Sequence, residues 1–158
     1  MDIFLLRHGI AEDHAASDAE RDLTADGRQK IREIAKVLKR AGVRPSLILS
    51  SPYRRALATA RIAAEVLECA EPIIETRELV PDGDPGHVWE EVRAHRTSDP
   101  LLLVGHQPLF GDLAAFLLGA PDLRVDFKKG AVLALEMPGF GVRPRGILKW
   151  MLTARLAA

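Results

Sequence analysis

The chain has one cysteine, no long apolar run and no net charge, and each of these absences excludes a class of protein. Because Cys69 has no second cysteine to pair with, an internal disulfide framework and a multi-cysteine metal site are both excluded. No stretch approaches the ~20 apolar residues of a membrane span, and the amino terminus lacks the basic region of a signal peptide, so we expect a cytoplasmic protein. The 22 basic and 22 acidic residues argue against general nucleic-acid binding and against attraction to a membrane surface.

Several ligand-binding motifs are missing as well. The chain contains no Gly-x-x-x-x-Gly-Lys loop and no Gly-x-Gly-x-x-Gly, which removes the usual fingerprints of nucleoside-triphosphate and dinucleotide binding. It also lacks the Gly-x-Ser-x-Gly elbow of serine hydrolases. No cluster of carboxylates or cysteines accompanies His8 and His106, and two imidazoles are too few to hold a metal. We therefore expect neither a metal nor another cofactor.

The charges are balanced overall but unevenly distributed. Acidic residues dominate from Glu65 to Asp99, whereas basic residues lead after Pro121. We interpret both stretches as solvated surface rather than as partner-binding faces. The basic residues of the later stretch are Arg124, Lys128, Lys129, Arg143, Arg145, Lys149 and Arg155.

Short apolar runs alternate with amphipathic segments, which predicts strands alternating with helices. Strands are expected at residues 3–6, 46–50, 72–75, 101–104, 131–137 and 147–152. Helices are expected after Thr24 as N-cap, from Pro52 to about Glu68 with Ser51 as N-cap, at 87–96 following a loop from Glu78 to Gly86, and after Pro108. The alternation predicts one α/β domain over residues 1–158. We expect a three-layer sandwich in which a mainly parallel, twisted sheet carries helices on both faces, with some late strands antiparallel.

Three of the expected strands end near basic or imidazole side chains. Arg7 and His8 follow the first strand, Arg54 and Arg55 lie in the first turn of the helix after the second, and His106 follows the strand at 101–104. Because the carboxyl ends of parallel strands meet at one edge of a doubly wound sheet, these side chains would together trap an anion. Arginine binds phosphate with a fork of donors, and histidine can act as a nucleophile near neutral pH. The pattern therefore predicts transfer of a phosphoryl group to an imidazole.

The same residues lie in motifs that resemble those of a known family. The motifs are Leu6-Arg7-His8-Gly9, Leu23-Thr24-x-x-Gly27, Ser50-Ser51-Pro52-x-x-Arg55-Ala56-x-x-Thr59 and Val104-Gly105-His106-Gln107-Pro108. In order and spacing they resemble the histidine phosphatase superfamily, the phosphoglycerate mutase-like group. The segment from Ala15 to Thr24 resembles in particular its small bacterial SixA-type phosphohistidine phosphatases. The resemblance covers the chain from its start to about Pro108 and implies a phosphoglycerate mutase-like fold.

The resemblance also implies a role for each motif residue. His8 would be the nucleophile that takes the phosphoryl group, forming a phosphohistidine that water then hydrolyses. Arg7, Arg55 and His106 would hold the phosphoryl oxygens and stabilise charge in the in-line transition state. Further candidates for contacts with the substrate are Arg21, Gly9 and Ser51.

The proton donor to the leaving group is the point at which this chain departs from the family's pattern. Larger members carry an acidic residue in an insertion before the later strands, whereas this chain has only a short segment from Arg77 to Gly86 there. An alkoxide needs such a donor more than an imidazole does, because the nitrogen of a phosphoramidate is more easily protonated. The candidate donors in the segment are Glu78, Asp82 and Asp84.

These features predict a metal-independent phosphatase that acts on a phosphohistidine-bearing protein, for which a phosphotransfer domain is a candidate. The short chain leaves little material for a lid, which also favours a protein substrate. The alternative enzyme is a phosphomonoesterase acting on a small molecule such as a sugar phosphate or nucleotide. A phosphorelay-binding module without catalysis is the non-enzymatic alternative. We expect phosphate or a similar anion in the site, and neither a nucleic acid nor a membrane as partner.

Overall fold

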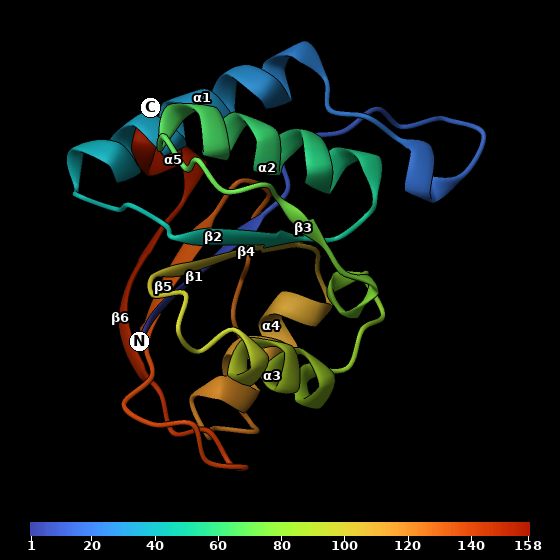
Figure 1. Cartoon of the computed structure of the whole chain (residues 1–158). Helices are drawn as coiled ribbons and strands as arrows, with labels where there is room; N and C mark the ends of the chain where they lie inside the picture. Colours follow the sequence, from blue (N-terminus) through green and yellow to red (C-terminus); the bar gives the residue numbers. More distant parts are fainter.

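The computed structural model describes residues 1–158 as a six-stranded sheet with helices on both of its faces (Figure 1). The strands are β1 (Asp2–Arg7), β2 (Leu47–Ser50), β3 (Ile74–Glu75), β4 (Leu101–Gly105), β5 (Val132–Glu136) and β6 (Ile147–Leu152). The helices are α1 (Ala25–Arg40), α2 (Arg54–Val66), α3 (Pro85–Ala94), α4 (Leu109–Leu117) and α5 (Ala154–Ala157), with short 3₁₀ turns η1 (Asp18–Glu20) and η2 (Arg77–Leu79). None of these helices combines the length and the apolarity that crossing a membrane requires. The expected three-layer α/β sandwich is confirmed.

Four neighbouring strands of the sheet run parallel. The strand order is β3-β2-β4-β1-β5-β6, in which β3, β2, β4 and β1 pair in parallel, β5 pairs antiparallel with β1, and β6 pairs antiparallel with β5. The register aligns Arg7 of β1 with Gly105 of β4, and Ser50 of β2 with Val104 of β4. The residues that follow β1, β2 and β4 therefore leave the sheet at one edge, where ligands bind in sheets of this kind.

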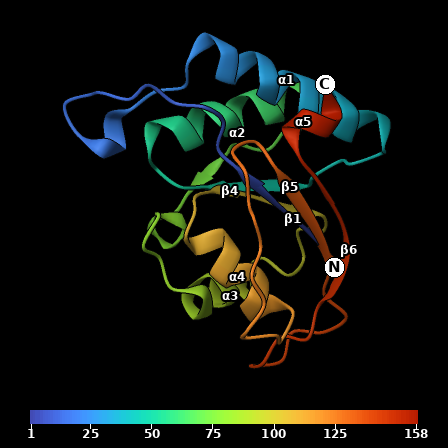
Figure 2. The same ribbon diagram turned by 180° about the vertical axis from the view of Figure 1, so that it is seen from behind.

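The two faces of the sheet carry separate apolar cores because successive side chains of a strand point to opposite sides. On one face, Phe4 and Leu6 of β1 pack with the apolar sides of α1 and α2. On the other face, Ile3 and Leu5 pack with apolar side chains of α3 and α4. Figure 2 shows these two helices on the side of the sheet opposite α1 and α2. All four β1 side chains are at most 8% exposed, and each stabilises the fold by ~1.5–3 kcal/mol through burial.

Helix α1 begins as the sequence predicts, with Thr24 as its N-cap. The Thr24 hydroxyl accepts a hydrogen bond from the Gly27 N–H at 2.9 Å, which satisfies one of the free donors at the helix start. Gly27 has a second reason to be glycine, because a Cβ there would collide with the carbonyl oxygen of Ile10. The Thr24 N–H donates to that same oxygen at 3.0 Å, so the loop that leaves β1 is anchored to the start of α1.

Helix α2 starts later than expected. The expected N-cap is Ser51 with Pro52 in the first turn, and this is wrong: the helix begins at Arg54, with Tyr53 at the cap position and no side-chain cap. The reason is that the Ser51 hydroxyl has other partners. It accepts a hydrogen bond from the Tyr53 N–H at 3.2 Å and bonds the ring of His106 at 2.8 Å.

Helix α3 starts earlier than expected. The sequence predicts a loop through Gly86 and a helix from His87, whereas the structure begins the helix at Pro85. The carboxylate of Asp84 caps it by accepting hydrogen bonds from the N–H groups of Gly86 at 2.8 Å and His87 at 3.2 Å. Proline is favoured at the first helical position because its missing N–H would have no partner there.

Candidate active site

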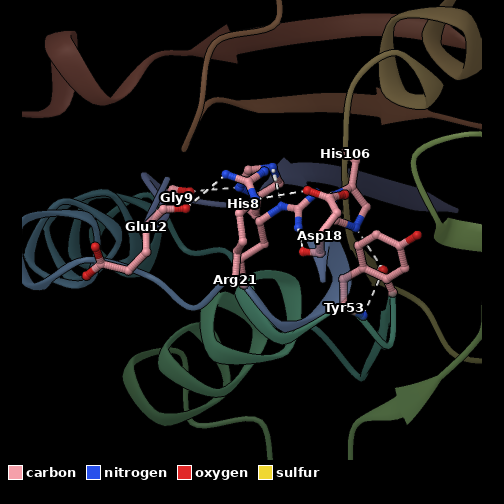
Figure 3. Close-up of polar contacts among 9 residues, drawn as sticks. His8, Gly9, Glu12, Asp18, Arg21, Tyr53 and His106 are labelled. Atoms are coloured by element: carbon pink, nitrogen blue, oxygen red, sulfur yellow. Dashed lines mark hydrogen bonds and ion pairs between the residues drawn. The ribbon is translucent and has the colours of Figure 1, made fainter. Parts of the chain in front are cut away.

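The predicted strand ends meet at one edge of the sheet. His8 follows β1 and His106 follows β4, and their ring centroids lie 5.0 Å apart. Arg55 reaches them from the first turn of α2, where its Nε–H donates to His8 Nε2 at 3.4 Å (Figure 3). All three side chains are at most 5% exposed. Two imidazoles and a guanidinium that are distant in sequence therefore share one buried cluster.

The hydrogen bonds of His8 leave one ring nitrogen free of a proton. Its Nδ1 lies 2.7 Å from the carbonyl oxygen of Gly9, which can only accept, so Nδ1 carries the proton. Nε2 then presents its lone pair toward Arg55. Burial lowers the pKa of His8 to about 3, assisted by the charges of Arg55, Arg7 and Lys129 and opposed by the Gly9 carbonyl. The imidazole is consequently neutral at pH 7, which is the form that a nucleophile requires.

Ser51 holds His106 in the same tautomer as His8, with the ring proton on Nδ1. His106 Nε2 lies 2.8 Å from Ser51 Oγ, which already accepts a hydrogen bond from the Tyr53 N–H. Ser51 is fully buried and its hydroxyl makes no other side-chain hydrogen bond, so we assign its proton to the bond with Nε2. The ring proton is then on Nδ1, which is buried and has no partner within the protein. Burial lowers the pKa of His106 to about 2, with further contributions from His8 and Arg55.

Asp18 fixes the far side of the Arg55 guanidinium. Arg55 Nη1 donates to the Asp18 carbonyl oxygen at 2.7 Å and Nη2 to its carboxylate at 3.2 Å. The same carboxylate accepts from Arg21 Nε at 2.9 Å (Figure 3). Burial raises the pKa of Asp18, but the hydrogen bonds from Arg21 and Arg55 outweigh burial and hold this pKa below its usual value. Arg55 therefore spans the distance between a carboxylate and His8 in one fixed orientation.

Thr59 ties the loop after β1 to helix α2. Its hydroxyl accepts from the Gly9 N–H at 3.2 Å and donates to the Arg55 carbonyl oxygen at 2.8 Å. A Cβ on Gly9 would lie 2.8 Å from Ile31 Cγ1, so this glycine allows close packing of the loop against α1. The buried Thr59 hydroxyl thus links the backbone next to His8 to the backbone of Arg55.

Arg7 lies beside this cluster without a hydrogen bond to it. Its Nη1 donates to the carbonyl oxygen of Phe127 at 2.6 Å, and its Nε is buried without a partner in the protein. Burial and the nearby charge of Arg55 lower the pKa of Arg7, while Asp126 opposes them. The Nε–H of Arg7 is therefore still able to donate.

Sequence comparison identifies the family. The family model described as "Histidine phosphatase superfamily (branch 1)" matches residues 3–80. Phosphohistidine phosphatase SixA of Escherichia coli strain K12 is 35% identical over 119 residues, which cover 74% of each chain. The chain belongs to the histidine phosphatase superfamily. It is accordingly a phosphatase, as the sequence motifs predict.

Solved structures agree with this family and confirm the phosphoglycerate mutase-like fold. The histidine phosphatase superimposes on protein histidine phosphatase SixA complexed with tungstate with a TM-score of 0.89, at 29% identity and 98% coverage of both chains. Alpha-ribazole phosphatase from Shigella flexneri gives a TM-score of 0.77 at 19% identity, covering 98% of this chain and 97% of that one. At that identity the second likeness describes the fold alone.

The further candidate residues of this histidine phosphatase lie around the cluster rather than inside it. Arg21 binds Asp18 and the Glu12 carbonyl oxygen, and Ser51 binds His106. Neither Asp18 nor Tyr53 was among the candidates. The ring of Tyr53 lies 5.1 Å from that of His106 and 5.2 Å from the guanidinium carbon of Arg55. Asp18 lies in the segment that resembles the SixA-type proteins, three residues before Arg21, and this spacing was the available clue.

The three candidate proton donors of the histidine phosphatase make no hydrogen bond or ion pair with His8 or His106. Asp84 caps α3, and Glu78 lies 3.5 Å from the ring of His87. Asp82 is exposed and has no ion pair. The assignment of the donor stays a prediction. No three His, Cys, Asp or Glu side chains gather closely enough to hold a metal ion.

The buried histidine pair makes the stability of the fold depend on pH. The pKa values of His8 and His106 fall from the usual 6.5 to about 3 and about 2, so between pH 6.5 and 3 the unfolded chain binds protons that the native one does not. Stability therefore falls as the pH is lowered through this window, by up to ~1.4 kcal/mol per pH unit for each histidine. We expect His106→Gln to lose stability less steeply than the original chain in urea unfolding between pH 7 and 4. Parallel curves for the two proteins would contradict this.

Proposed function

We propose that this histidine phosphatase removes phosphate from a phosphohistidine on a protein, such as a phosphotransfer domain, with residues 1–158 acting as one domain. The observation that carries the proposal is the buried, neutral His8, whose free Nε2 lies 3.4 Å from Arg55 Nε and whose ring lies 5.0 Å from that of His106. SixA of Escherichia coli, a phosphohistidine phosphatase by name, and the SixA complex with the tetrahedral oxyanion tungstate support it. A cytoplasmic location remains part of this proposal.

Two in-line displacements account for the chemistry. In the first, the lone pair of His8 Nε2 attacks phosphorus, the bond from phosphorus to the substrate imidazole nitrogen breaks, and that nitrogen takes up a proton from water or from one of the candidate acids. In the second, water attacks the phosphohistidine of His8, releasing inorganic phosphate and restoring the neutral imidazole. Arg7, Arg55 and the Nδ1–H of His106 donate to the phosphoryl oxygens, whose negative charge persists throughout the transfer. Positioning and charge stabilisation therefore supply most of the catalysis.

The leaving group distinguishes a phosphohistidine from a phosphate ester. None of the three candidate acids forms a hydrogen bond or ion pair with His8 or His106, Asp84 caps α3, and Glu78 lies beside His87. An alkoxide leaves slowly without a proton donor, whereas the nitrogen of a phosphoramidate is protonated readily. This supports a phosphohistidine substrate over a sugar phosphate or a nucleotide, with Glu78 and Asp82 as the remaining candidate donors.

Competition between the two substrate classes tests the proposal. We expect kcat/KM for a phosphorylated phosphotransfer domain to exceed that for any sugar phosphate or nucleotide by at least ~100-fold, the lower end of what a general acid contributes. Release of inorganic phosphate from each substrate is measured with the same enzyme preparation. Comparable values for the two classes would identify the protein as a small-molecule phosphomonoesterase instead.

A further inference from the structure

A basic cavity adjoins the catalytic cluster, and Arg7 belongs to the wall between them. The cavity measures about 780 Å³, and its lining residues belong mainly to α1, α5, the loop that precedes β5 and the end of β1. Figure 2 shows α5 beside α1. The Nη1 of Arg7 is held by the Phe127 carbonyl oxygen, and its Nε has no partner in the protein. Lys129 also lines the cavity, and its charge acts on the His8 ring. The cavity is therefore contiguous with the site where phosphate is expected.

Positive charge dominates the lining of this cavity. Two acidic side chains, Glu33 and Asp126, face five basic ones. Asp126 pairs with Lys128 at 3.3 Å, whereas Glu33 makes no ion pair and its carboxylate lies 3.5 Å from the amide nitrogen of Gln29. The five basic residues are Arg7, Lys30, Lys128, Lys129 and Arg155. Lys30 pairs with Asp26 and Lys128 with Asp126, whereas Arg7, Lys129 and Arg155 have no acidic partner within 4.0 Å. This excess of unpaired cations attracts an anionic group beyond the one held by His8.

The cavity gathers part of the basic stretch that follows Pro121 in the sequence. Lys128, Lys129 and Arg155 come from that stretch, and β5 and β6 bring them to the catalytic edge of the sheet. Other members of the stretch do not lie there. Lys149 pairs with Glu136 at 3.5 Å, and Arg145 belongs to the turn between β5 and β6 at the opposite end, where Met137 bonds Met1. The interpretation of the whole stretch as solvated surface is therefore incomplete.

We propose that this cavity binds carboxylate side chains that flank the phosphohistidine of the protein substrate. The inference rests on the proposed function and adds to it the kind of surface that surrounds the target histidine. Exposed lysines act as mobile point charges, which suits several carboxylates in varied positions better than one fixed ligand. A cavity of this size also exceeds what a single small anion fills. An acidic protein surface is the ligand that satisfies both conditions.

Attraction of this kind acts mainly on the rate of encounter. Complementary charges steer association and raise the on-rate, an effect that salt suppresses because the screening length is only ~10 Å at 0.1 M. We therefore expect the cavity to raise kcat/KM for an acidic substrate at low salt and to contribute little at high salt. The chemical step at His8 is the same for every substrate.

Two peptides test the inference. Both carry a central phosphohistidine, one with two glutamates on each side and the other with glutamines in their place. We expect the enzyme to hydrolyse the acidic peptide with a kcat/KM about tenfold higher at low ionic strength, as is typical of a few steering charges. The variant Lys128→Glu/Arg155→Glu should lose or reverse this preference. Arg145→Glu makes a single charge reversal at the far end of the sheet and should retain it.

The outcomes separate this inference from the proposed function. Equal rates for the two peptides in the original enzyme, or an unchanged preference in Lys128→Glu/Arg155→Glu, would overturn the docking cavity and leave the phosphohistidine activity standing. Failure to hydrolyse either peptide would overturn the proposed function itself. The urea unfolding midpoint of each variant shows that it is folded, and Lys128→Gln/Arg155→Gln replaces the reversal if that variant is unstable. This neutral variant should hydrolyse the acidic and the glutamine peptide with nearly equal kcat/KM.

Discussion

Replacing His8 by asparagine is expected to lower kcat for a phosphohistidine substrate by about 10⁴-fold or more, which is the size of the loss expected when a covalent nucleophile is removed. Asparagine preserves a polar side chain of similar size but has no ring nitrogen to accept the phosphoryl group. In the original protein, brief incubation with labelled substrate and quenching in alkali should trap phosphate on the chain, because phosphohistidine survives there. The asparagine variant should carry no label.

The control for this experiment is another histidine. His95 lies at the end of α3, where its ring bonds the Glu91 carbonyl oxygen. His95→Asn should keep both the turnover and the labelled intermediate within about twofold of the original, as expected for a residue outside the site. A labelled chain in His8→Asn, or a loss of activity smaller than ~100-fold, would show that the phosphoryl group travels by another route.

Changing Arg55 to lysine is expected to lower kcat/KM by about 10²–10³-fold, the usual cost of one preorganised donor in the transition state. Arg55 is 4% exposed, and its three nitrogens bond His8 and two oxygens of Asp18 at once. A lysine has a single nitrogen and cannot make all of these contacts. The expected loss lies mainly in kcat, because the charge remains while its fixed orientation is lost.

The neighbouring arginine is a matched control. The side chain of Arg54 is 64% exposed and pairs with Asp22 at 3.3 Å on the outer side of α2. Arg54→Lys keeps the charge at a site where orientation matters little, so kcat/KM should change by less than about twofold. Steady-state kinetics on one phosphohistidine substrate, with urea unfolding of both variants, makes the comparison. Equal losses in the two variants would remove Arg55 from the catalytic cluster.

The motif residues were predictable because their neighbours along the chain determine where they go. His8 and His106 each follow a short apolar run that is typical of a buried strand, and parallel strands end at one edge. Asp18 was not predictable in this way. It reaches Arg55 across 37 positions through an irregular loop whose path depends on packing. Ser51 was misassigned as a helix cap because its sequence context suits a cap, while the competing partner, His106, is 55 positions away.

The sequence by itself determined the order of the six strands and of the first four helices, the edge at which the candidate anion-binding side chains collect, and the family, but it did not predict α5. Hydrophobic periodicity and short motifs are local properties of the chain, so they can be recognised without a three-dimensional structure. Only the tertiary structure decided which nitrogen of each histidine is free, how far burial lowers the pKa of His8 and His106, and which basic residues join in one cavity. These properties depend on desolvation and on contacts between distant segments, and no stretch of sequence contains them.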